Sequence, residues 1–204
     1  MHTVKTSLPA VLLFALLFAG AQAQNVSRPI ADFEKNSVEN VDGLTPAVIA
    51  DEQLGGTSHA RLSVIRPGAE GSRGALRISY TITNDSAMPF AGVWAAVDPK
   101  GLATDVSAYR GVRFLVRAKG GAFRAGVFQL AAPPKVYMAP FDVGPEWTLV
   151  EVPFAKFSRV TPSGAPANDP APLVPDNVTS IGFNVSPELR GQFELDVDRW
   201  ELYR

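Results

Sequence analysis

The chain has 204 residues, with 19 Lys and Arg, 20 Asp and Glu, two His and no Cys. The lack of cysteine excludes a disulfide framework, a thiol nucleophile and cysteine-ligated zinc or iron–sulfur sites. A net charge of −1 supplies no basic field for nucleic acid, so no nucleic-acid partner is expected. A hydrophobic content of 46% beside 19% charged residues is typical of a chain that folds around an apolar core.

The N-terminus has the features of a secretory leader. Lys5 precedes an unbroken apolar run over Val11–Ala19, and Ala21-Gln22-Ala23 then fits the small-x-small cleavage pattern. We therefore expect a signal peptide over residues 1–23, a single domain over residues 24–204, and a secreted or periplasmic protein. The apolar run is shorter than the roughly 20 residues of a membrane helix, so no membrane span is expected after cleavage.

Short runs with a period of two follow along the rest of the chain. Between Leu76 and Ile82, apolar and polar residues alternate strictly, which predicts a strand with one buried face. Further strands are expected in residues 61–65, 93–97, 112–117, 123–130, 147–152, 181–185 and 193–203. Lys119-Gly120-Gly121 predicts a hairpin. Many short strands separated by regular turns predict an all-β antiparallel sandwich or barrel.

A Pro-rich loop is expected over residues 158–177, which contain five prolines. Loops of this length are uncommon in compact domains and are either functional or loosely ordered. The abundance of alanine and proline favours a semi-rigid surface segment that could border a binding face.

The residues offer little catalytic chemistry. His59 is the only histidine beyond residue 23, and neither a G-x-S-x-G nor an H-E-x-x-H pattern is present. We therefore predict that the protein is not an enzyme and has no catalytic residues.

One catalytic alternative stays open at the C-terminal strand. Glu194, Asp196 and Asp198 alternate with apolar residues, so a strand would place the three carboxylates on one face, about 6.8 Å apart. Glycosidases hold their two carboxyl groups at about 5–9.5 Å, so a glycan-active hydrolase is geometrically feasible. Trp200 and Leu202 follow on the same nominal face, which predicts either a bulge near Arg199 or a change there in what covers the strand.

A structural calcium ion is the only cofactor that the acids suggest. Glu34 opens the predicted domain and Asp198 lies near its end, so neighbouring first and last strands would bring their oxygens together. Calcium takes 6–8 oxygen ligands, and carboxylates supply them well. Glu34 and Asp198 are therefore candidate metal ligands.

Five residues are candidates for ligand binding. Trp94 lies opposite the apolar face of its predicted strand, and Tyr137 lies in a Pro-flanked segment. Arg124, Gln129 and Asn184 are polar positions in otherwise apolar strands. Aromatic and polar side chains of this kind can bind a ligand in a groove; equally, they can form the solvated side of a sheet.

Laid out in order, several short motifs resemble those of the family of the NADH:ubiquinone oxidoreductase intermediate-associated protein, a mitochondrial complex I assembly factor with bacterial relatives. The matching segments are Asp32-Phe33-Glu34, Gly55–Ser58, Phe90–Val93, Asp105–Val112, Trp147 with Val152–Phe157, Ile181–Phe183 and Phe193–Asp198. This family is similar to galactose-binding-like jelly rolls and to carbohydrate-binding modules, and the resemblance implies that fold here.

The resemblance also shapes the expected function. Together with the expected secretory leader, it indicates an exported, non-catalytic binding module whose partner is a glycan or a protein, with the hydrolase above or an assembly factor for an envelope complex as alternatives. The expected secretory leader argues against the mitochondrial role itself.

Overall fold

The computed structural model describes residues 27–131, 133–161, 164–169 and 171–204. The expected signal peptide of residues 1–23 lies outside the described residues. None of the helices in the described parts of the chain is long and apolar enough to cross a membrane.

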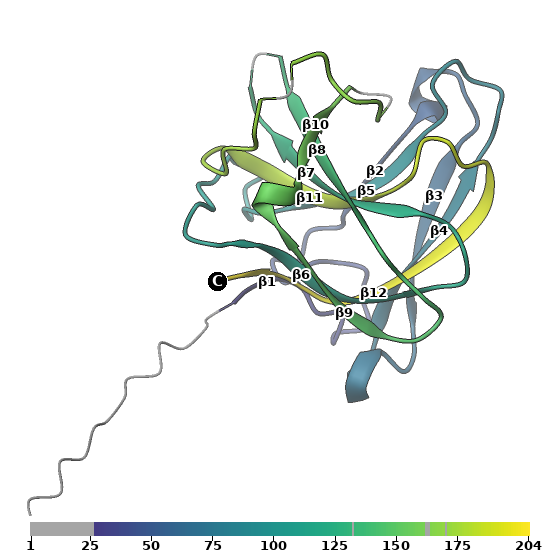
Figure 1. The fold of residues 1–204 in the computed structure, drawn as a ribbon. Coiled ribbons are helices and arrows are strands. Elements are labelled where there is room, and N and C mark those ends of the chain that lie inside the picture. Colours follow the sequence, from purple (N-terminus) through teal and green to yellow (C-terminus); the bar gives the residue numbers. More distant parts are fainter. Residues whose placement is uncertain (1–26, 132, 162–163, 170) are drawn as a thin grey trace, which may run out of the picture.

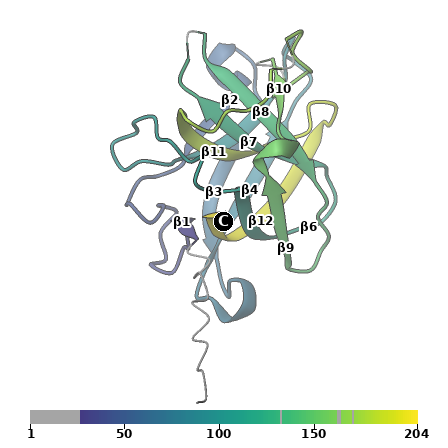
Figure 2. The same cartoon turned by 60° about the vertical axis from the view of Figure 1, so that its left-hand side comes forward.

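Two six-stranded sheets face each other (Figures 1 and 2), and every strand pair within them is antiparallel. Sheet 1 has the order β3 (His59–Ile65), β4 (Ala75–Ile82), β12 (Gly191–Tyr203), β6 (Gly111–Ala118) and β9 (Thr148–Pro153), with β1 (Arg28–Ala31) pairing to β12. Sheet 2 has the order β10 (Ser158–Val160), β8 (Lys135–Phe141), β7 (Phe123–Gln129), β11 (Val178–Val185), β5 (Ala91–Ala96) and β2 (Ala47–Ala50). Three short 3-10 helices complete the fold: η1 (Asp51–Leu54), η2 (Ala69–Gly71) and η3 (Phe154–Lys156). The predicted antiparallel β-sandwich is confirmed.

The core lies between the sheets and is built by the alternation seen in the sequence. In β4 the apolar residues from Leu76 to Ile82 are buried, while the polar residues between them are partly exposed. Aromatic rings fill the centre, where the Phe183 ring lies 4.8 Å from that of Phe114 and 4.6 Å from that of Trp200. Each buried side chain of this size contributes about 1.5–3 kcal/mol relative to an exposed one. The core therefore stabilises the fold without any disulfide.

The predicted hairpin at Lys119–Gly121 is wrong. β6 belongs to sheet 1 and β7 to sheet 2, so these residues carry the chain from one sheet to the other. Gly120 and Gly121 adopt φ angles of 75° and 93°, which residues with a Cβ rarely adopt. A glycine turn is therefore present, but the strands on either side of it pair with different partners.

The loop expected over residues 158–177 begins with a strand. β10 pairs with β8, and Val160 packs against Trp94 and Met138. The later part is fastened to the sandwich, since Val106 N donates to Pro175 O at 2.8 Å and Gln129 Nε2 donates to Val174 O. The described parts of the segment thus pack closely on the sheets.

The bulge predicted near Arg199 is present in β12. The register towards β6 shifts between Asp198 and Glu201, and Arg199 adopts a left-handed φ of 44°. The shift reverses the alternation, so Trp200 and Leu202 enter the core instead of following Asp198 outward.

Candidate ligand-binding site

The outward face of sheet 2 carries a second apolar cluster, separate from the core. Trp94, Met138 and Val160 form it, with Phe128 and Val136 packed alongside. Pairing across the strands sets Trp94, Gly182, Gly126 and Met138 in one row. The next row holds Ile49, Gly92, Asn184, Arg124 and Pro140. The structure thus brings together three of the five predicted ligand-binding residues: Trp94, Arg124 and Asn184.

Glycines make room for the Trp94 indole across three strands. A Cβ at Gly126 would lie 2.5 Å from Cη2 of Trp94, and one at Gly182 would lie 2.7 Å from Cδ2. The six-membered ring therefore rests on the bare backbone of β7 and β11. Trp94 is only 7% exposed, because Phe128, Met138 and Val160 surround it. It thus lies on the face expected from the sequence but has little exposed surface.

Asn184 fills the space above Gly92, beside the indole. A Cβ at Gly92 would lie 2.1 Å from Asn184 Oδ1 and 2.8 Å from Trp94 Nε1, so both polar atoms border the same point. Asn184 is 6% exposed, and its Nδ2 is buried with no hydrogen-bond partner in the described parts of the chain. The amide oxygen and the indole N–H are therefore held close together on the backbone of β5.

Arg124 lies directly across the strand pair from Asn184. Its Nη1 donates to Gly164 O at 2.9 Å, while its Nε is buried and has no partner among the described residues. Burial lowers the pKa of the guanidinium, an effect partly opposed by the negative charge of Glu188. An unpaired buried donor costs about 1–3 kcal/mol, so Arg124 Nε and Asn184 Nδ2 are two adjacent places where an added acceptor would be stabilising.

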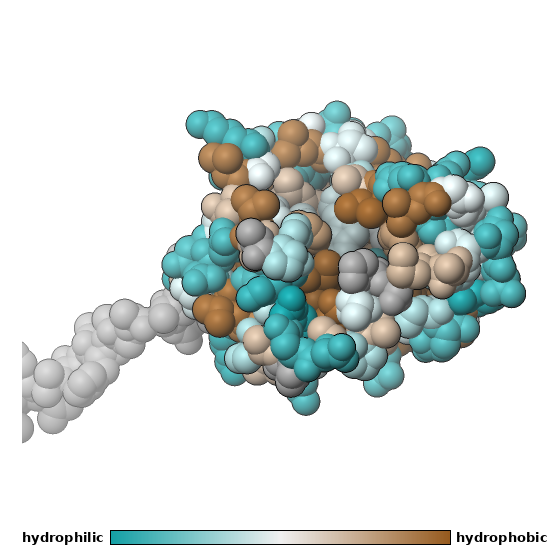
Figure 3. All heavy atoms as spheres, turned by 90° about the horizontal axis from the view of Figure 1, so that it is seen from above, coloured by the Kyte–Doolittle hydropathy of each residue, from teal (hydrophilic) through white to brown (hydrophobic). Residues whose placement is uncertain are grey.

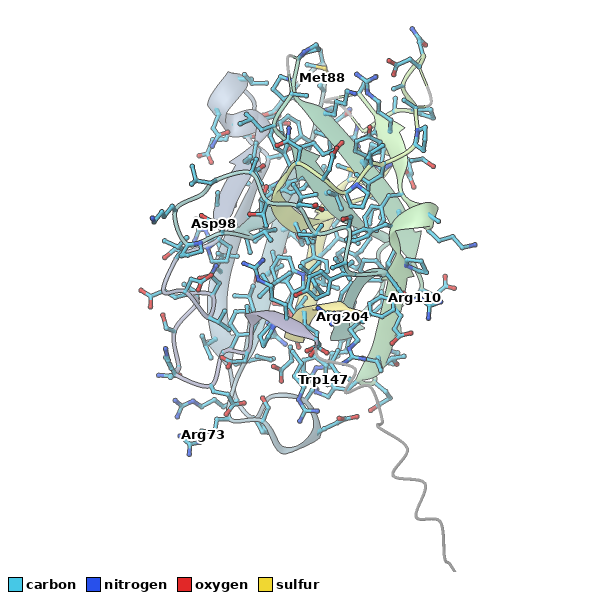
Figure 4. All side chains as sticks on the ribbon, turned by 90° about the vertical axis from the view of Figure 1, so that its left-hand side faces the viewer. Arg73, Met88, Asp98, Arg110, Trp147 and Arg204 are labelled. Atoms are coloured by element: carbon cyan, nitrogen blue, oxygen red, sulfur yellow. The ribbon has the colours of Figure 1, made fainter. Side chains whose placement is uncertain are left out.

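Apolar side chains are also exposed near this face. Ile49 in β2, Leu54 in η1 and Met88 in the β4–β5 loop are 39%, 69% and 43% exposed. Seen from above, hydrophobic side chains surround a hollow in the surface (Figure 3), and Met88 lies at the top of the molecule (Figure 4). The β4–β5 loop is tied to η1, since Phe90 N donates to the buried carboxylate of Asp51.

The other two predicted ligand-binding residues lie elsewhere. Tyr137 belongs to the main core, and Gln129 is buried at the end of β7. The Gln129 amide donates to Val174 O, and the Tyr137 hydroxyl approaches Pro172 O at 3.5 Å. They line a pocket of about 330 Å³ under the Pro-rich segment and hold that segment in place. Alternation along the two strands separates them from Trp94.

The three acids of β12 occupy the outward face of sheet 1, as the alternation predicts. Arg77 donates through Nε and Nη2 to Asp196 at 2.7 and 2.9 Å, and Arg117 Nε donates to the same carboxylate at 2.9 Å. The hydrogen bond to Asp196 raises the pKa of Arg77. The Arg117 guanidinium also lies 4.7 Å from the ring centre of Trp147, near the bottom of Figure 4. Both oxygens of Asp196 are therefore engaged by arginines.

The predicted metal ligands Glu34 and Asp198 contact one loop. Asp198 Oδ2 accepts from Ala69 N at 2.8 Å and from the Ser72 hydroxyl at 2.6 Å, and Glu34 accepts from Arg73 N. Among the described residues, no group of three or more His, Cys, Asp or Glu side chains is arranged to hold a metal ion. The calcium site stays a prediction, and in the structure the two acids hold the loop before β4.

The fold is similar to that of solved carbohydrate-binding modules. The family 11 carbohydrate-binding module of a Clostridium thermocellum cellulosomal cellulase superposes with a TM-score of 0.66 at 19% identity, over 87% of this chain and 94% of that one. The same kind of module in complex with a β-1,3-1,4-mixed-linked tetrasaccharide gives a TM-score of 0.64 at 19% identity, over 87% and 95% of the two chains. The protein has the β-sandwich, jelly-roll fold of carbohydrate-binding modules.

The sequence then identifies the family. Residues 31–197 match Complex I intermediate-associated protein 30 (CIA30), and the chain belongs to this family. A 55-residue segment is 40% identical to the mitochondrial Complex I intermediate-associated protein 30 of Mus musculus, covering 27% of this chain and 16% of the mouse protein. The match thus spans about a sixth of the curated relative. The chain thus combines the sequence of this family with the fold of carbohydrate-binding modules.

The expected location must be corrected. The curated relative is a mitochondrial protein, so the prediction of a secreted or periplasmic protein is wrong. That prediction depended on the interpretation of residues 1–23 as a secretory leader. Only their composition and a short cleavage pattern supported this interpretation.

Proposed function

We propose that this protein is a non-catalytic glycan-binding module, and that the ligand binds on the outward face of sheet 2. Three glycines hold the Trp94 indole flat against the sheet, beside the amide of Asn184 and the guanidinium of Arg124. Sugar-binding surfaces combine an aromatic ring with a few fixed polar groups in this way. The solved module that carries a mixed-linked tetrasaccharide has the same fold, which supports the proposal.

One observation carries the proposal: two buried donors on neighbouring strands, Arg124 Nε and Asn184 Nδ2, have no hydrogen-bond partner among the residues that the structure describes. Native proteins pair nearly all buried polar groups, so orphaned donors beside an aromatic ring call for an explanation. A sugar oxygen that replaces the missing partner provides one.

Affinity electrophoresis of the full chain against a panel of soluble glycans tests the proposal. Mixed-linkage β-glucan, xylan, galactan and polygalacturonate are suitable matrices, and at least one should retard the protein. Asn184→Ala should lower the affinity calculated from that retardation at least about tenfold. It should leave the melting temperature close to wild type, because it deletes an unpaired donor.

The tryptophans provide a matched pair of variants. Trp94→Ala should abolish retardation, whereas Trp147→Ala, which changes the face of sheet 1, should not. Lack of retardation by every glycan would refute glycan binding. Release of reducing sugar that disappears in Glu194→Gln would instead establish the hydrolase.

A second candidate is the binding of a protein partner, which the family match favours. Ile49, Leu54 and Met88 expose apolar surface near the same face, as protein interfaces often do. Replacement of all three by Ser should abolish cross-linking to that partner, and Leu102→Ser, a similarly exposed site elsewhere, should leave it intact.

A further inference from the structure

The strands of sheet 2 present a positive charge, and no negative one, at the described positions of their outward face. The outward positions of its six strands are Ala47, Ile49, Gly92, Trp94, Ala96, Arg124, Gly126, Phe128, Val136, Met138, Pro140, Ser158, Val160, Ser180, Gly182 and Asn184. Arg124 is the only charged residue among these described positions, and none of them is acidic. The face therefore offers a fixed cation with no carboxylate from its own strands to neutralise it.

The two unpaired atoms on this face are both donors. Arg124 Nε carries one N–H and Asn184 Nδ2 carries two, and the two residues are direct partners across β7 and β11. A hydroxyl group both donates and accepts, whereas an ionised carboxylate only accepts and does so with two oxygens. Two adjacent donors, one of them on a guanidinium, match a carboxylate better than they match a hydroxyl group.

Neither Glu188 nor Gly164 gives Arg124 a charged hydrogen-bond acceptor. Glu188, in the loop after β11, acts on Arg124 through its charge but makes no ion pair with it within the described residues. Within the described part of the chain, the one acceptor that Arg124 has is the neutral carbonyl oxygen of Gly164. Because a charged acceptor binds a guanidinium more strongly than a neutral carbonyl does, a ligand carboxylate can take the place of Gly164 O.

We infer that the ligand of this face is an acidic glycan, whose uronate carboxylate binds Arg124 and Asn184 while its ring lies beside Trp94. The inference rests on the proposed glycan-binding function and names the class of sugar. Both donors are buried in the free protein, so the Arg124 and Asn184 side chains turn towards the ligand as it binds. Binding then exchanges the Arg124–Gly164 hydrogen bond for a charged one and satisfies donors that are unpaired among the described residues. No atom is transferred and no bond is cleaved.

Matched polymers separate this inference from the proposed function. Polygalacturonate and alginate would be compared with the same polymers after reduction of their carboxyl groups, by isothermal titration calorimetry with the full chain. We expect the acidic form to bind at least about tenfold more tightly, the effect of one charge-assisted hydrogen bond. Raising the salt concentration should weaken binding of the acidic form and leave the reduced form unaffected.

Arg124→Gln should bring the affinity for the acidic polymer down to that for the reduced one, and Arg124→Lys should recover part of the difference. Arg61→Gln, which removes an exposed arginine from β3 in sheet 1, should change neither affinity. If Arg124→Gln does not fold, the salt titration of the wild-type chain decides alone. Equal binding of both forms overturns the inference and leaves the proposed function standing. If the protein binds neither form and binds no neutral glycan, both the inference and the proposed function are overturned.

Discussion

Trp94 lies so close to Gly126 that a single methyl group at residue 126 would come within 2.5 Å of the indole Cη2. The backbone of β7 and the aromatic ring of β5 are thus packed across the intervening strand β11. This contact sets the position of the ring.

Gly126→Ala should displace the indole and destabilise the protein by about 1–3 kcal/mol, the usual cost of overpacking. Tryptophan fluorescence should shift to the red as the ring leaves its apolar surroundings, and glycan affinity should fall with it. Gly144→Ala is the control, since a Cβ there meets no atom within 4 Å. Wild-type fluorescence and stability in Gly126→Ala would show that the ring is not placed by this contact.

Asp198 should be important for stability. It is fully buried and accepts hydrogen bonds from Ala69 N, the Ser72 hydroxyl and Arg199 N. Asp198→Ala leaves these donors unpaired and should cost about 3 kcal/mol in urea denaturation. Asp142→Ala, at an exposed position, should change stability by less than about 0.5 kcal/mol. A small effect of Asp198→Ala would mean that water replaces the carboxylate.

Calcium removal tests the predicted metal site at Glu34 and Asp198. If an ion is bound there, a chelator should lower the melting temperature, and added calcium should restore it because ligand binding to the native state stabilises that state. Glu34→Gln should abolish the response while retaining the fold. A melting temperature that is the same in calcium and in chelator contradicts the site and leaves both acids with their loop contacts alone.

The carboxyl group of Asp85 should contribute to the pH dependence of stability. Hydrogen bonds from Thr57 and Thr83 lower the pKa of its carboxyl group below the ordinary value. A lowered folded-state pKa stabilises the protein above the pKa of the unfolded chain, and the benefit is lost as the pH falls through the folded-state value. Asp85→Asn should therefore melt below wild type at neutral pH, and the two curves should converge in acid. A constant difference across the acid range would contradict the lowered pKa.

Much of the fold could be predicted from local pattern. The alternation in β4 and β6 identified the buried faces, and the break in alternation after Asp198 located the bulge in β12. The predictions of these features succeed because the period of two in a strand is a local property of the backbone. The Lys119–Gly121 turn failed as a hairpin because glycines define a turn but not which sheet the next strand joins.

The residues of the candidate site could also be predicted only in part from local pattern. By itself, the sequence determined the sandwich class, the absence of cysteine chemistry and the outward position of Trp94, since composition and alternation suffice for these. Only the tertiary structure decided that Arg124 and Asn184 are partners beside that ring while Gln129 and Tyr137 are not. The pairing of β5, β11 and β7 joins residues far apart in the chain, and its register depends on how both sheets pack as a whole.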